Sequence, residues 1–536
     1  MTNVGEGEAI YIPGDHRLVV VSNRLPVSLV KRKGGRWSRQ PGTGGLVTAL
    51  EPVLRQRGGM WIGWSGVVDV DPSEVQARLD RECEDVPYHL HAVALSGYDK
   101  RNFYQGAANE ILWPLCHGMV ARCNYQHLYW QAYREVNRRF ALAVADVARC
   151  DDFVWVHDYH LMTVAEELRA LGFRERLAFF LHTPFPSLDV FEQLPWSEEV
   201  LGALLRYDLL GFQTTRDLRN FLQCVDVIAG ADIVVERERV LLVRTGGSVR
   251  VGTFPISIDT RLFVEGAADP RVHAESKALL APLAQQRVLL GVDRLDYTKG
   301  IPEKLLGFER ALEKYPELLG RVALLQLVAP SRERVPEYGR MKEEIEGLVG
   351  RINGRFTTGG WVPILYSFDS WSQHQLMAYY RIAHVGLVTP LRDGMNLVSK
   401  EFVAASSDDG GVLVLSAFAG SAQELGDGAL LVNPHDVEAV ADAIYRACTM
   451  GPEERARRLA LLRKHVQTHD VHRWVEEFLE MARGLPAPVA LPARAGVRPL
   501  WDQKTPRRPS SRRPARQRAS EPASPLGGPP SGPASA

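Results

Sequence analysis

Residues 288–301 read VLLGVDRLDYTKGI, and this stretch shows the pattern from which the fold can be predicted. A short apolar run at Val288–Gly291 passes through a polar turn and reaches a helical pattern after Gly300. Continuous apolar runs separated by helices are typical of parallel strands that are covered on both faces. The pattern recurs at Leu18–Val21, Phe153–Val156, Leu177–Leu181, Val322–Val328, Val385–Val388, Val412–Leu415 and Ala429–Val432. The sequence therefore predicts an α/β protein with parallel sheets.

The length of the chain, 536 residues, is too great for one ordinary core, so we expect two domains. The segment TFPISIDT, residues 253–260, looks like a join between two αβ units. We therefore predict an N-terminal domain over 17–254 and a C-terminal domain over 255–485, preceded by a flexible segment at 1–16. From Pro486 the composition changes to Pro, Arg, Ser, Ala and Gly, which predicts a disordered basic tail over 486–536.

The composition is that of a soluble globular protein, with 45% hydrophobic and 24% charged residues. The net charge is zero but unevenly spread. The tail from Pro486 carries nine Lys/Arg against two Asp/Glu, and the rest of the chain carries 55 against 62. A mildly acidic body is not suited to bind nucleic acid along its surface, so no nucleic-acid partner is expected. A basic tail that touches polyanions or a partner is the weaker alternative to a solvated tail.

The six cysteines form no C-x-x-C pair, which is typical of reduced thiols in a cytosolic protein. The N-terminus lacks a basic segment followed by an apolar run, so no signal peptide is expected. No stretch approaches the roughly 20 apolar residues of a transmembrane span. We expect a cytoplasmic protein without a membrane partner; the sequence leaves its oligomeric state open, a homo-oligomer included.

Polar residues follow the N-terminal strands at the edge where ligands bind in parallel α/β sheets. Arg24 follows the first strand, His157-Asp158-Tyr159-His160 ends another, and His182 follows a third. A single histidine is more often structural, and an isolated HDYH is poor evidence for a metal. Glycines at 42–45 could let backbone N–H groups approach a phosphate, but they do not match the G-x-G-x-x-G dinucleotide fingerprint.

The C-terminal domain carries a stronger signal. Arg294 and Lys299 lie at a strand end before a helix, which suits a diphosphate leaving group. Surface ion pairs with the neighbouring aspartates are the alternative. After the strand Val385–Val388, Gly394 permits an unusual turn, and the N–H groups of residues 395–398 could open a helix onto phosphates. Glu401 lies on the same helical face, where it could accept hydrogen bonds from a ribose diol.

Together these motifs resemble the trehalose-6-phosphate synthase family, retaining glycosyltransferases of family 20. The resemblance runs from about Arg17 to about Leu479. It rests on blocks in the family's order: VVVSNRLPV, WIGWSG, LWPLCH, VWVHDYHLM, FFLHTPFP, LLGFQT, DRLDYTKGIPEK, VTPLRDGMNLVSKEFVA and LSAFAGSAQEL. It implies a GT-B fold, two Rossmann-like doubly wound domains facing across a cleft. It further implies transfer of glucose from UDP-glucose to glucose 6-phosphate, giving α,α-trehalose 6-phosphate and UDP, without a metal or another cofactor.

The resemblance also implies which residues form the site. Trp113, His182, Arg294 and Lys299 form the expected catalytic set, the first two orienting the sugars and the last two holding the diphosphate. The expected donor-binding residues are Gly44, Gly45, Arg294, Lys299, Trp371, Asp393, Leu397, Val398 and Glu401. The expected acceptor-binding residues are Arg24, Tyr104, Asp158 and Arg332. Arg24 and Arg332 would clamp a phosphate, because a planar guanidinium meets phosphate oxygens bidentately.

The implied mechanism is a same-face substitution, in which the leaving phosphate takes the proton of the acceptor hydroxyl. No carboxylate stands out as a covalent nucleophile. The chain departs from the family around residues 102–119, where Ala107, Ala108 and Gly118 replace larger side chains. A glucosylglycerol-phosphate synthase that uses glycerol 3-phosphate is therefore the main alternative. A non-catalytic sugar-phosphate sensor is improbable because the charged site residues are all present. The nucleotide base of the donor stays open.

Overall fold

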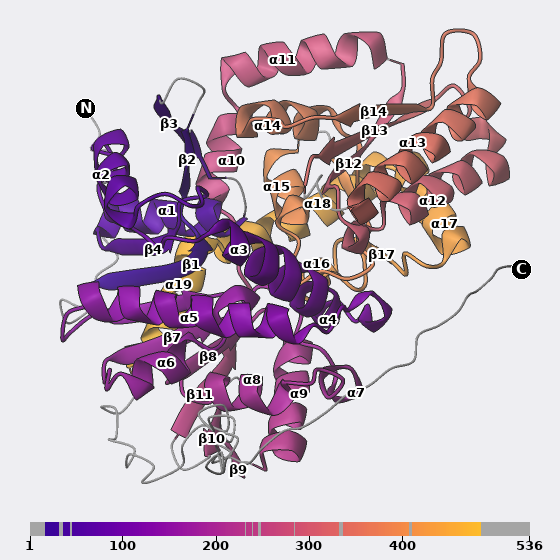
Figure 1. Ribbon diagram of the computed structural model, residues 1–536. Helices are drawn as coiled ribbons and strands as arrows, with labels where there is room; N and C mark the ends of the chain where they lie inside the picture. Colours follow the sequence, from indigo (N-terminus) through magenta and orange to yellow (C-terminus); the bar gives the residue numbers. More distant parts are fainter. Residues whose placement is uncertain are drawn as a thin grey trace, which may run out of the picture. The chain divides into compact units, whose positions relative to one another are not determined.

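The computed structural model describes residues 17–31, 36–42, 45–230, 232–237, 240–244, 248–283, 285–331, 336–406 and 410–483 (Figure 1). The chain divides into one unit over Met1–Val489 and another over Ala490–Ala536, and every described residue belongs to the first. The expected flexible segment at 1–16, the expected tail at 486–536, Gly44 and Arg332 lie outside the described residues. The domain boundary expected at residue 254 stays a prediction.

The N-terminal half of the described chain is built on a nine-stranded sheet. Seven parallel strands run in the order β5-β4-β1-β6-β7-β8-β11, and β10 and β9 extend it antiparallel beyond β11. The strands are β1 (Leu18–Arg24), β4 (Met60–Trp64), β5 (His89–Ala92), β6 (Phe153–His157), β7 (Arg176–Phe180), β8 (Leu209–Phe212), β9 (Asp232–Arg237), β10 (Val240–Arg244) and β11 (Ser248–Thr253). A separate hairpin joins β2 (Val27–Lys31) to β3 (Trp37–Pro41).

Helices cover both faces of this sheet. They are α1 (Gly45–Arg57), α2 (Pro72–Glu82), α3 (Gly97–Asp99), α4 (Trp113–Cys116), α5 (His127–Val147), α6 (Val164–Ala170), α7 (Leu188–Phe191), α8 (Ser197–Leu204), α9 (Thr215–Cys224) and the π-helix η1 (Lys100–Leu112). The residues of β6 alternate between the two faces, as the strand period requires. Val154 and Val156 belong to the core beneath η1, α5 and α6, whereas Phe153 and Trp155 belong to the core beneath α1 and α2.

The C-terminal half is built on a six-stranded parallel sheet in the order β14-β13-β12-β15-β16-β17. Its strands are β12 (Arg287–Arg294), β13 (Val322–Ala329), β14 (Ile364–Phe368), β15 (Val385–Val388), β16 (Val412–Ser416) and β17 (Leu430–Val432). Counted in chain order this is the Rossmann order 3-2-1-4-5-6, and the parallel strands of the N-terminal sheet follow the same order with one strand added. The prediction of two Rossmann-like doubly wound sheets is confirmed.

Helices also cover both faces of the C-terminal sheet. They are α10 (Thr260–Ala267), α11 (Pro270–Leu280), α12 (Ile301–Lys314), α13 (Pro336–Phe356), α14 (Gln373–Ile382), α15 (Leu397–Ala405), α16 (Ala422–Leu425), α17 (Val437–Thr449) and α18 (Pro452–Thr468). The core on one face contains α12, α13 and α17, and the core on the other contains α10, α14, α15 and α18. No helix of the described residues is long and apolar enough to cross a membrane.

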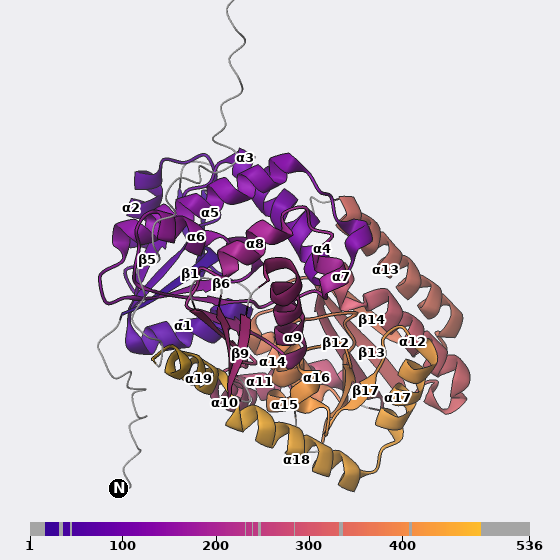
Figure 2. The same ribbon diagram turned by 90° about the horizontal axis from the view of Figure 1, so that it is seen from below.

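The last helix, α19 (Val471–Arg483), returns to the N-terminal sheet and lies beside α1 (Figure 2). Its Trp474 and Phe478 pack on Trp155 with ring centroids 5.1 and 4.3 Å apart. The Trp474 indole also donates to the backbone carbonyl of Phe254 at 3.1 Å. The chain therefore passes between the two sheets twice, first through residues 253–260 and again between α18 and α19.

Candidate active site

The expected site residues follow the carboxyl ends of strands in both sheets, and the two sheets touch at these ends. Arg24 ends β1, while Asp158 and His182 follow β6 and β7. Arg294 ends β12 and Asp393 follows β15. This is the edge where ligands bind in doubly wound sheets. The structure therefore brings residues from five strand ends to the facing edges.

The backbones of the two halves pack closely at Gly394. A Cβ atom at Gly394 would overlap the backbone carbonyl of His182, and a Cβ atom at Gly420 would overlap the backbone carbonyl of Gly394. Glycine is needed here for close packing rather than for an unusual backbone angle. The positive φ of this turn, 78°, belongs to Asn396. The expected turn is present, but its glycine serves the contact between the halves.

A second contact between the halves runs through Trp113. Its buried indole N–H points at Asp296 Oδ1 at 3.4 Å, and the Arg294 guanidinium lies 5.7 Å from its ring centroid. Asp296 also accepts hydrogen bonds from the backbone and hydroxyl of Thr298, at 3.0 and 2.9 Å. An indole from the N-terminal half thus rests on the turn that carries two expected diphosphate-binding cations.

Sequence reasoning missed His117, which contacts this indole. The two ring centroids are 4.2 Å apart, and His117 Nδ1 lies 2.8 Å from the backbone carbonyl of Trp113. Burial lowers the pKa of His117 to about 4, so the ring is neutral near pH 7. His117 is four residues after Trp113, and this helical spacing within LWPLCH was the signal that could have found it.

Lys299 and Asp393 form an ion pair on the donor side. Lys299 Nζ donates to Asp393 Oδ2 at 2.5 Å, and Asn396 Nδ2 donates to the same oxygen at 3.1 Å. Burial alone would raise the pKa of Asp393, but the charge and hydrogen bond of Lys299 lower it below its usual value. The carboxylate of Asp393 is therefore ionised at neutral pH, and the pair has little surface exposed, since each side chain is about 15% exposed or less.

Arg294 is the more exposed donor-side cation, with 51% of its side chain accessible. The ion pairs proposed as its alternative role are weak or absent. Its guanidinium is 3.8 Å from Asp296 Oδ2, whereas Asp293 is buried and paired with Lys304. The exposed guanidinium is available to a ligand in the way that the diphosphate hypothesis requires.

Asn396 caps the N-terminus of α15, and its side chain accepts a hydrogen bond from the Ser399 N–H at 3.3 Å. Leu397 and Val398 are partly buried, and a Cβ atom at Gly45 would lie 2.7 Å from the Leu397 side chain. The start of α1 therefore touches the start of α15. The helix N-terminus offers backbone N–H groups of the kind that bind phosphates.

Glu401 lies one turn along α15 and is held by Tyr380, whose hydroxyl donates to Oε2 at 2.7 Å. Burial raises the pKa of Glu401. Trp371 packs against the same apolar core as Leu397 and Val398, and its indole hydrogen-bonds with Tyr379. The roles of both residues at a ribose and a base stay predictions.

Trp64 brings together Arg24 and Tyr104, two of the residues expected to bind the acceptor. The Arg24 guanidinium lies 4.5 Å from the Trp64 ring centroid, and the Tyr104 ring lies 5.9 Å from it, edge-on. Arg24 also donates to Ser28 Oγ at 3.0 Å, and within the described ranges no carboxylate pairs with it. Tyr104 is positioned by η1, a π-helical segment of the type often found at functional sites.

Asp158 has an unusual backbone, with a φ of 74°. Non-glycine residues rarely adopt this conformation, and when they do it often marks a functional site. Its carboxylate accepts the backbone N–H of His182 at 3.2 Å. Burial raises the pKa of Asp158 to about 6. The carboxylate is thus mostly ionised near pH 7 and becomes protonated as the pH falls through about 6.

Both ring nitrogens of His182 are engaged within the protein. Nε2 lies 3.1 Å from His157 Nδ1, and Nδ1 lies 3.4 Å from Gln213 Nε2. Burial lowers the pKa of His182 to about 3, so its ring is neutral at pH 7. Any part that His182 plays in orienting a sugar would therefore not depend on a charged ring.

The residues that differ from the family around Tyr104 have different surroundings. Ala107 and Ala108 have no exposed surface and belong to the core beneath η1, so they do not line a ligand pocket directly. Gly118 has a φ of 71°, and a Cβ atom there would lie 3.0 Å from the Arg392 guanidinium. Of the three, only Gly118 faces the donor-side loop.

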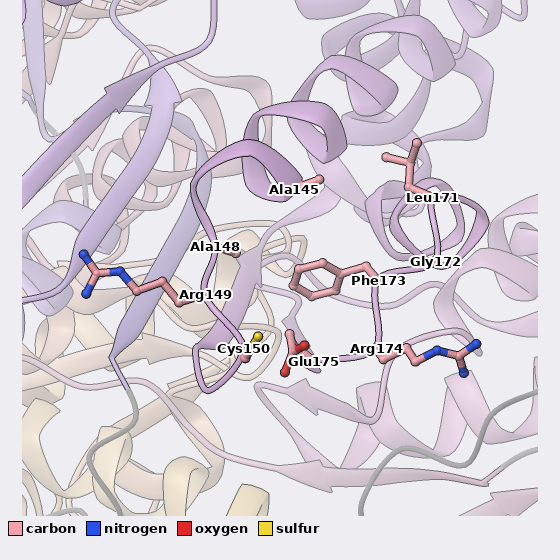
Figure 3. A pocket seen from close by; sticks show the side chains of 9 residues that line it. All are labelled: Ala145, Ala148, Arg149, Cys150, Leu171, Gly172, Phe173, Arg174 and Glu175. Atoms are coloured by element: carbon pink, nitrogen blue, oxygen red, sulfur yellow. The ribbon is translucent and has the colours of Figure 1, made fainter.

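Two further features were tested as ligand sites. No group of three or more His, Cys, Asp or Glu side chains that could hold a metal occurs among the residues that the structure describes. A cavity of about 360 Å³ lies at the amino ends of β6 and β7, where Phe173, Cys150 and Glu175 line it (Figure 3). Arg149 and Arg174 also border it, but their guanidinium groups extend away from it (Figure 3). This is the sheet edge opposite the expected site, so we assign it no part in the reaction.

Comparisons with known proteins show the family to which the chain is related. The family model for glycosyltransferase family 20 matches residues 16–483. The trehalose-6-phosphate synthase of Mycolicibacterium smegmatis is 44% identical over 88% of this chain and 93% of its own length. The Burkholderia xenovorans α,α-trehalose-phosphate synthase solved with glucose 6-phosphate has a TM-score of 0.79 at 36% identity, covering 87% of this chain and 100% of that chain. The E. coli protein bound with UDP-2-fluoro glucose has a TM-score of 0.78 at 36% identity, covering 88% of this chain and 99% of that chain.

Proposed function

The chain belongs to glycosyltransferase family 20, and from this premise we propose that it transfers glucose from UDP-glucose to glucose 6-phosphate with retention at the anomeric carbon. The products are α,α-trehalose 6-phosphate and UDP. The observation that carries the proposal is the contact of Trp113 with the Asp296 turn. Through this contact the Trp113 indole of the N-terminal half lies beside the turn that carries Arg294 and Lys299. The two-sheet GT-B architecture agrees with the solved relatives.

We propose that residues 17–254 bind the acceptor and residues 255–485 bind the nucleotide sugar. On the donor side, the exposed Arg294 and the first turn of α15 suit a diphosphate, since both present N–H donors to anionic oxygens. Lys299 would exchange part of its bond to Asp393 for the phosphate. The glucosyl hydroxyls would then bind the Asp393 carboxylate, and the ribose would bind Glu401.

On the acceptor side, Arg24 suits the phosphate of glucose 6-phosphate. It has a partner in Ser28 and an aromatic platform in Trp64 but no described carboxylate to neutralise it. Tyr104 and Asp158 lie near enough to the same strand ends to bind acceptor hydroxyls. Arg332, Gly44 and the placement of Trp371 near the base stay predictions from the family resemblance.

The chemistry needs charge stabilisation and positioning. Arg294, Lys299 and the helix N-terminus stabilise the negative charge that develops on the departing diphosphate. That phosphate receives the proton of the acceptor hydroxyl on the same face of the sugar. Trp113 and His182 border the reacting carbon as neutral groups. Contacts between the sheets exclude water that would otherwise hydrolyse the donor.

We propose that no metal takes part, because Arg294 and Lys299 supply the positive charge. Turnover should persist in excess chelator, and a complete loss that added metal reverses would contradict this. The cytoplasmic location and the absence of nucleic-acid and membrane partners stay predictions, and a homo-oligomer stays open.

The test is nucleotide release from UDP-glucose by the purified chain, with glucose 6-phosphate and glycerol 3-phosphate as parallel acceptors. We expect UDP and a non-reducing disaccharide phosphate with glucose 6-phosphate. The burial of Ala107 and Ala108 in the core favours this acceptor over glycerol 3-phosphate, since neither residue opens the pocket. Turnover with glycerol 3-phosphate alone would overturn the acceptor assignment, and turnover with neither would overturn the proposed function.

A further inference from the structure

The segment that joins the two sheets, residues 253–260, is held by side chains from both halves at a single residue. Gln213, directly after β8, accepts the backbone N–H of Ile256 through Oε1 at 2.9 Å. Lys400, on α15, donates from Nζ to the backbone carbonyl of Ile256 at 2.9 Å. Ile256 is itself 3% exposed, so both bonds are shielded from water. One residue of the join is thus bonded to each half of the molecule.

The bond to Ile256 determines which way the Gln213 amide points. A backbone N–H can only donate, so the amide oxygen faces Ile256 and the amide nitrogen must be the donor toward His182 Nδ1. His182 is neutral, and its single proton is therefore on Nε2, which faces His157 Nδ1 at 3.1 Å. His157 is neutral for the same reason of burial, and its proton is on Nε2. Every hydrogen bond from Ile256 to His157 then has one possible direction.

Lys400 connects the join to the donor side. It is fully buried and pairs with Glu424 at 2.7 Å, and Glu424 is 3.0 Å from His465 Nε2. Its neighbour in the sequence is Glu401, which is held by Tyr380. A buried lysine is costly unless it is paired and hydrogen-bonded. Here the second partner of Lys400, beyond what charge neutrality requires, is the carbonyl of Ile256.

We propose that Gln213 and Lys400 are positioning residues of the transfer reaction. They hold the backbone N–H and C=O of Ile256 from the two sides. This clamp keeps His182 on the acceptor side and α15 on the donor side in a fixed position relative to each other during transfer. The inference rests on the proposed function and adds residues that touch neither substrate. A purely structural network would affect folding alone, so the experiment separates turnover from stability.

The first experiment uses a double variant that removes the hydrogen bond from Lys400 to Ile256 without leaving an unpaired charge. The double variant Lys400→Met/Glu424→Leu replaces both members of the ion pair with apolar groups of similar size, a change that is often tolerated in cores. We expect a folded protein in which kcat falls at least tenfold, while the KM values for UDP-glucose and glucose 6-phosphate change less than threefold. A folded double variant with the parent's kcat would overturn the role of Lys400.

The second variant tests the amide of Gln213. Gln213→Glu keeps an oxygen that can accept the Ile256 N–H but removes the donor that faces His182 Nδ1. We expect a loss in kcat of at least tenfold with KM values within threefold of the parent. Selective ¹⁵N labelling of histidine supplies a signature in the same protein. The parent should show His182 protonated at Nε2, and the variant should show it protonated at Nδ1. An Nδ1 proton in the parent, or unchanged turnover in the variant, would overturn the clamp.

The matched control removes an ion pair of comparable burial away from the join. Arg17 donates to Asp152 at 2.6 and 3.0 Å at the amino ends of β1 and β6. In Arg17→Met/Asp152→Asn the second substitution keeps an acceptor for the Arg149 N–H, which Asp152 binds at 2.8 Å. We expect its thermal stability to fall with kcat near that of the parent. An equal loss of kcat in this control would show that the effect of the clamp variants is general destabilisation.

Failure of the clamp and failure of the proposed function are distinguishable. Absence of UDP release in the parent, with either acceptor, counts against the proposed function. Activity in the parent that is lost in the folded clamp variants, but kept in the control, supports the clamp. If the parent is inactive, the histidine tautomers still test the predicted hydrogen-bond directions, because the bonds from Ile256 to His157 do not depend on the substrate.

Discussion

The cations of the two facing edges, Arg24 and Lys299, are held in opposite ways. Arg24 rests on an aromatic ring and a hydroxyl, and no carboxylate among the described residues neutralises it. Lys299 is already bonded to Asp393 at 2.5 Å. An unpaired guanidinium offers its whole charge to an incoming phosphate, whereas a paired ammonium must share or exchange its partner. The proposed acceptor edge therefore presents a cation without a carboxylate partner among the described residues, and the proposed donor edge presents a cation that is already paired.

The carboxylates differ in the same sense. Burial dominates at Asp158 and raises its pKa to about 6, whereas the pairing with Lys299 dominates at Asp393 and lowers its pKa. Desolvation controls one edge and charge pairing controls the other. The two edges should therefore respond differently to the loss of a cation and to a change in pH.

The largest effect is expected at the paired cation. Lys299→Ala removes charge from the leaving group and leaves Asp393 without its ion-pair partner, so kcat should fall by roughly 100- to 1,000-fold, about 3–4 kcal/mol. The assay is UDP release at saturating substrates. Lys314→Ala, which removes a lysine from a surface network, is the control and should keep normal kcat. A kcat within threefold of the parent in Lys299→Ala would show that the diphosphate binds elsewhere.

The next effect separates the two edges. Arg24→Ala removes the unpaired cation, and a hydrogen bond to a charged group is worth about 1.5–3 kcal/mol. The KM for glucose 6-phosphate should therefore rise by roughly 10- to 100-fold, with the KM for UDP-glucose unchanged. Arg24→Lys should recover only part of the loss because an ammonium lacks the planar fork. A defect confined to UDP-glucose would reverse the assignment of the two edges.

The pH dependence tests the desolvated carboxylate. Asp158 should need to be ionised to accept hydrogen bonds from the hydroxyl groups of glucose 6-phosphate. The kcat/KM for glucose 6-phosphate should therefore fall as the pH drops through about 6. Asp158→Asn should be less active and lack this step. Asparagine also tolerates the positive φ at this position. A parent profile without a step near pH 6 would contradict the role.

The same substitution makes a stability prediction with a definite sign. Because the folded-state pKa is raised, ionised Asp158 destabilises the protein above pH 6, and this penalty disappears below the usual pKa of about 4. Asp158→Asn should therefore raise the free energy of unfolding by about 1–3 kcal/mol at pH 7.5, and the gain should vanish near pH 4. Denaturant unfolding at the two pH values measures it, and an equal gain at both would refute the cause.

The smallest effect is expected at Glu401. Glu401→Gln keeps an acceptor for Tyr380 but weakens the bond to a ribose hydroxyl by about 1 kcal/mol, so the KM for UDP-glucose should rise roughly fivefold. Tyr380→Phe is the companion variant, since it removes the tether and leaves the carboxylate. A change in the KM for glucose 6-phosphate alone would show that Glu401 acts on the acceptor and not on the donor, against this prediction.

The framework was predictable from local sequence. Each of the eight apolar runs overlaps a strand, because runs buried on both faces need no alternation to be recognised. The apolar runs did not predict strands such as β4, with the sequence MWIGW, and β8, with the sequence LLGF. In β8, Gly211 is required because Phe180 and Phe478 pack where a Cβ atom would be. That glycine is explained by side chains far away in the sequence, which no local pattern shows.

The place of the candidate site residues at strand ends was predictable from the sequence, but the partners of their side chains were not. The rule that ligands bind at strand ends was enough to select Arg24, Asp158 and Arg294, whereas Asp393 came from the family resemblance. It could not show that Asp393 pairs with Lys299, or that Lys400 reaches the backbone of Ile256. Such pairs depend on how the two sheets face each other.

The return of α19 to the first sheet has a consequence for how the protein is made. Trp474 and Phe478 cover Trp155 and Phe180, residues translated some 300 positions earlier. On the ribosome, the N-terminal sheet must therefore wait with part of one apolar face uncovered until nearly the whole globular chain has emerged. At about 5–20 residues per second this exposure lasts tens of seconds. The nascent chain is then most open to chaperone capture or aggregation, and a truncation before residue 471 would make that vulnerable state permanent.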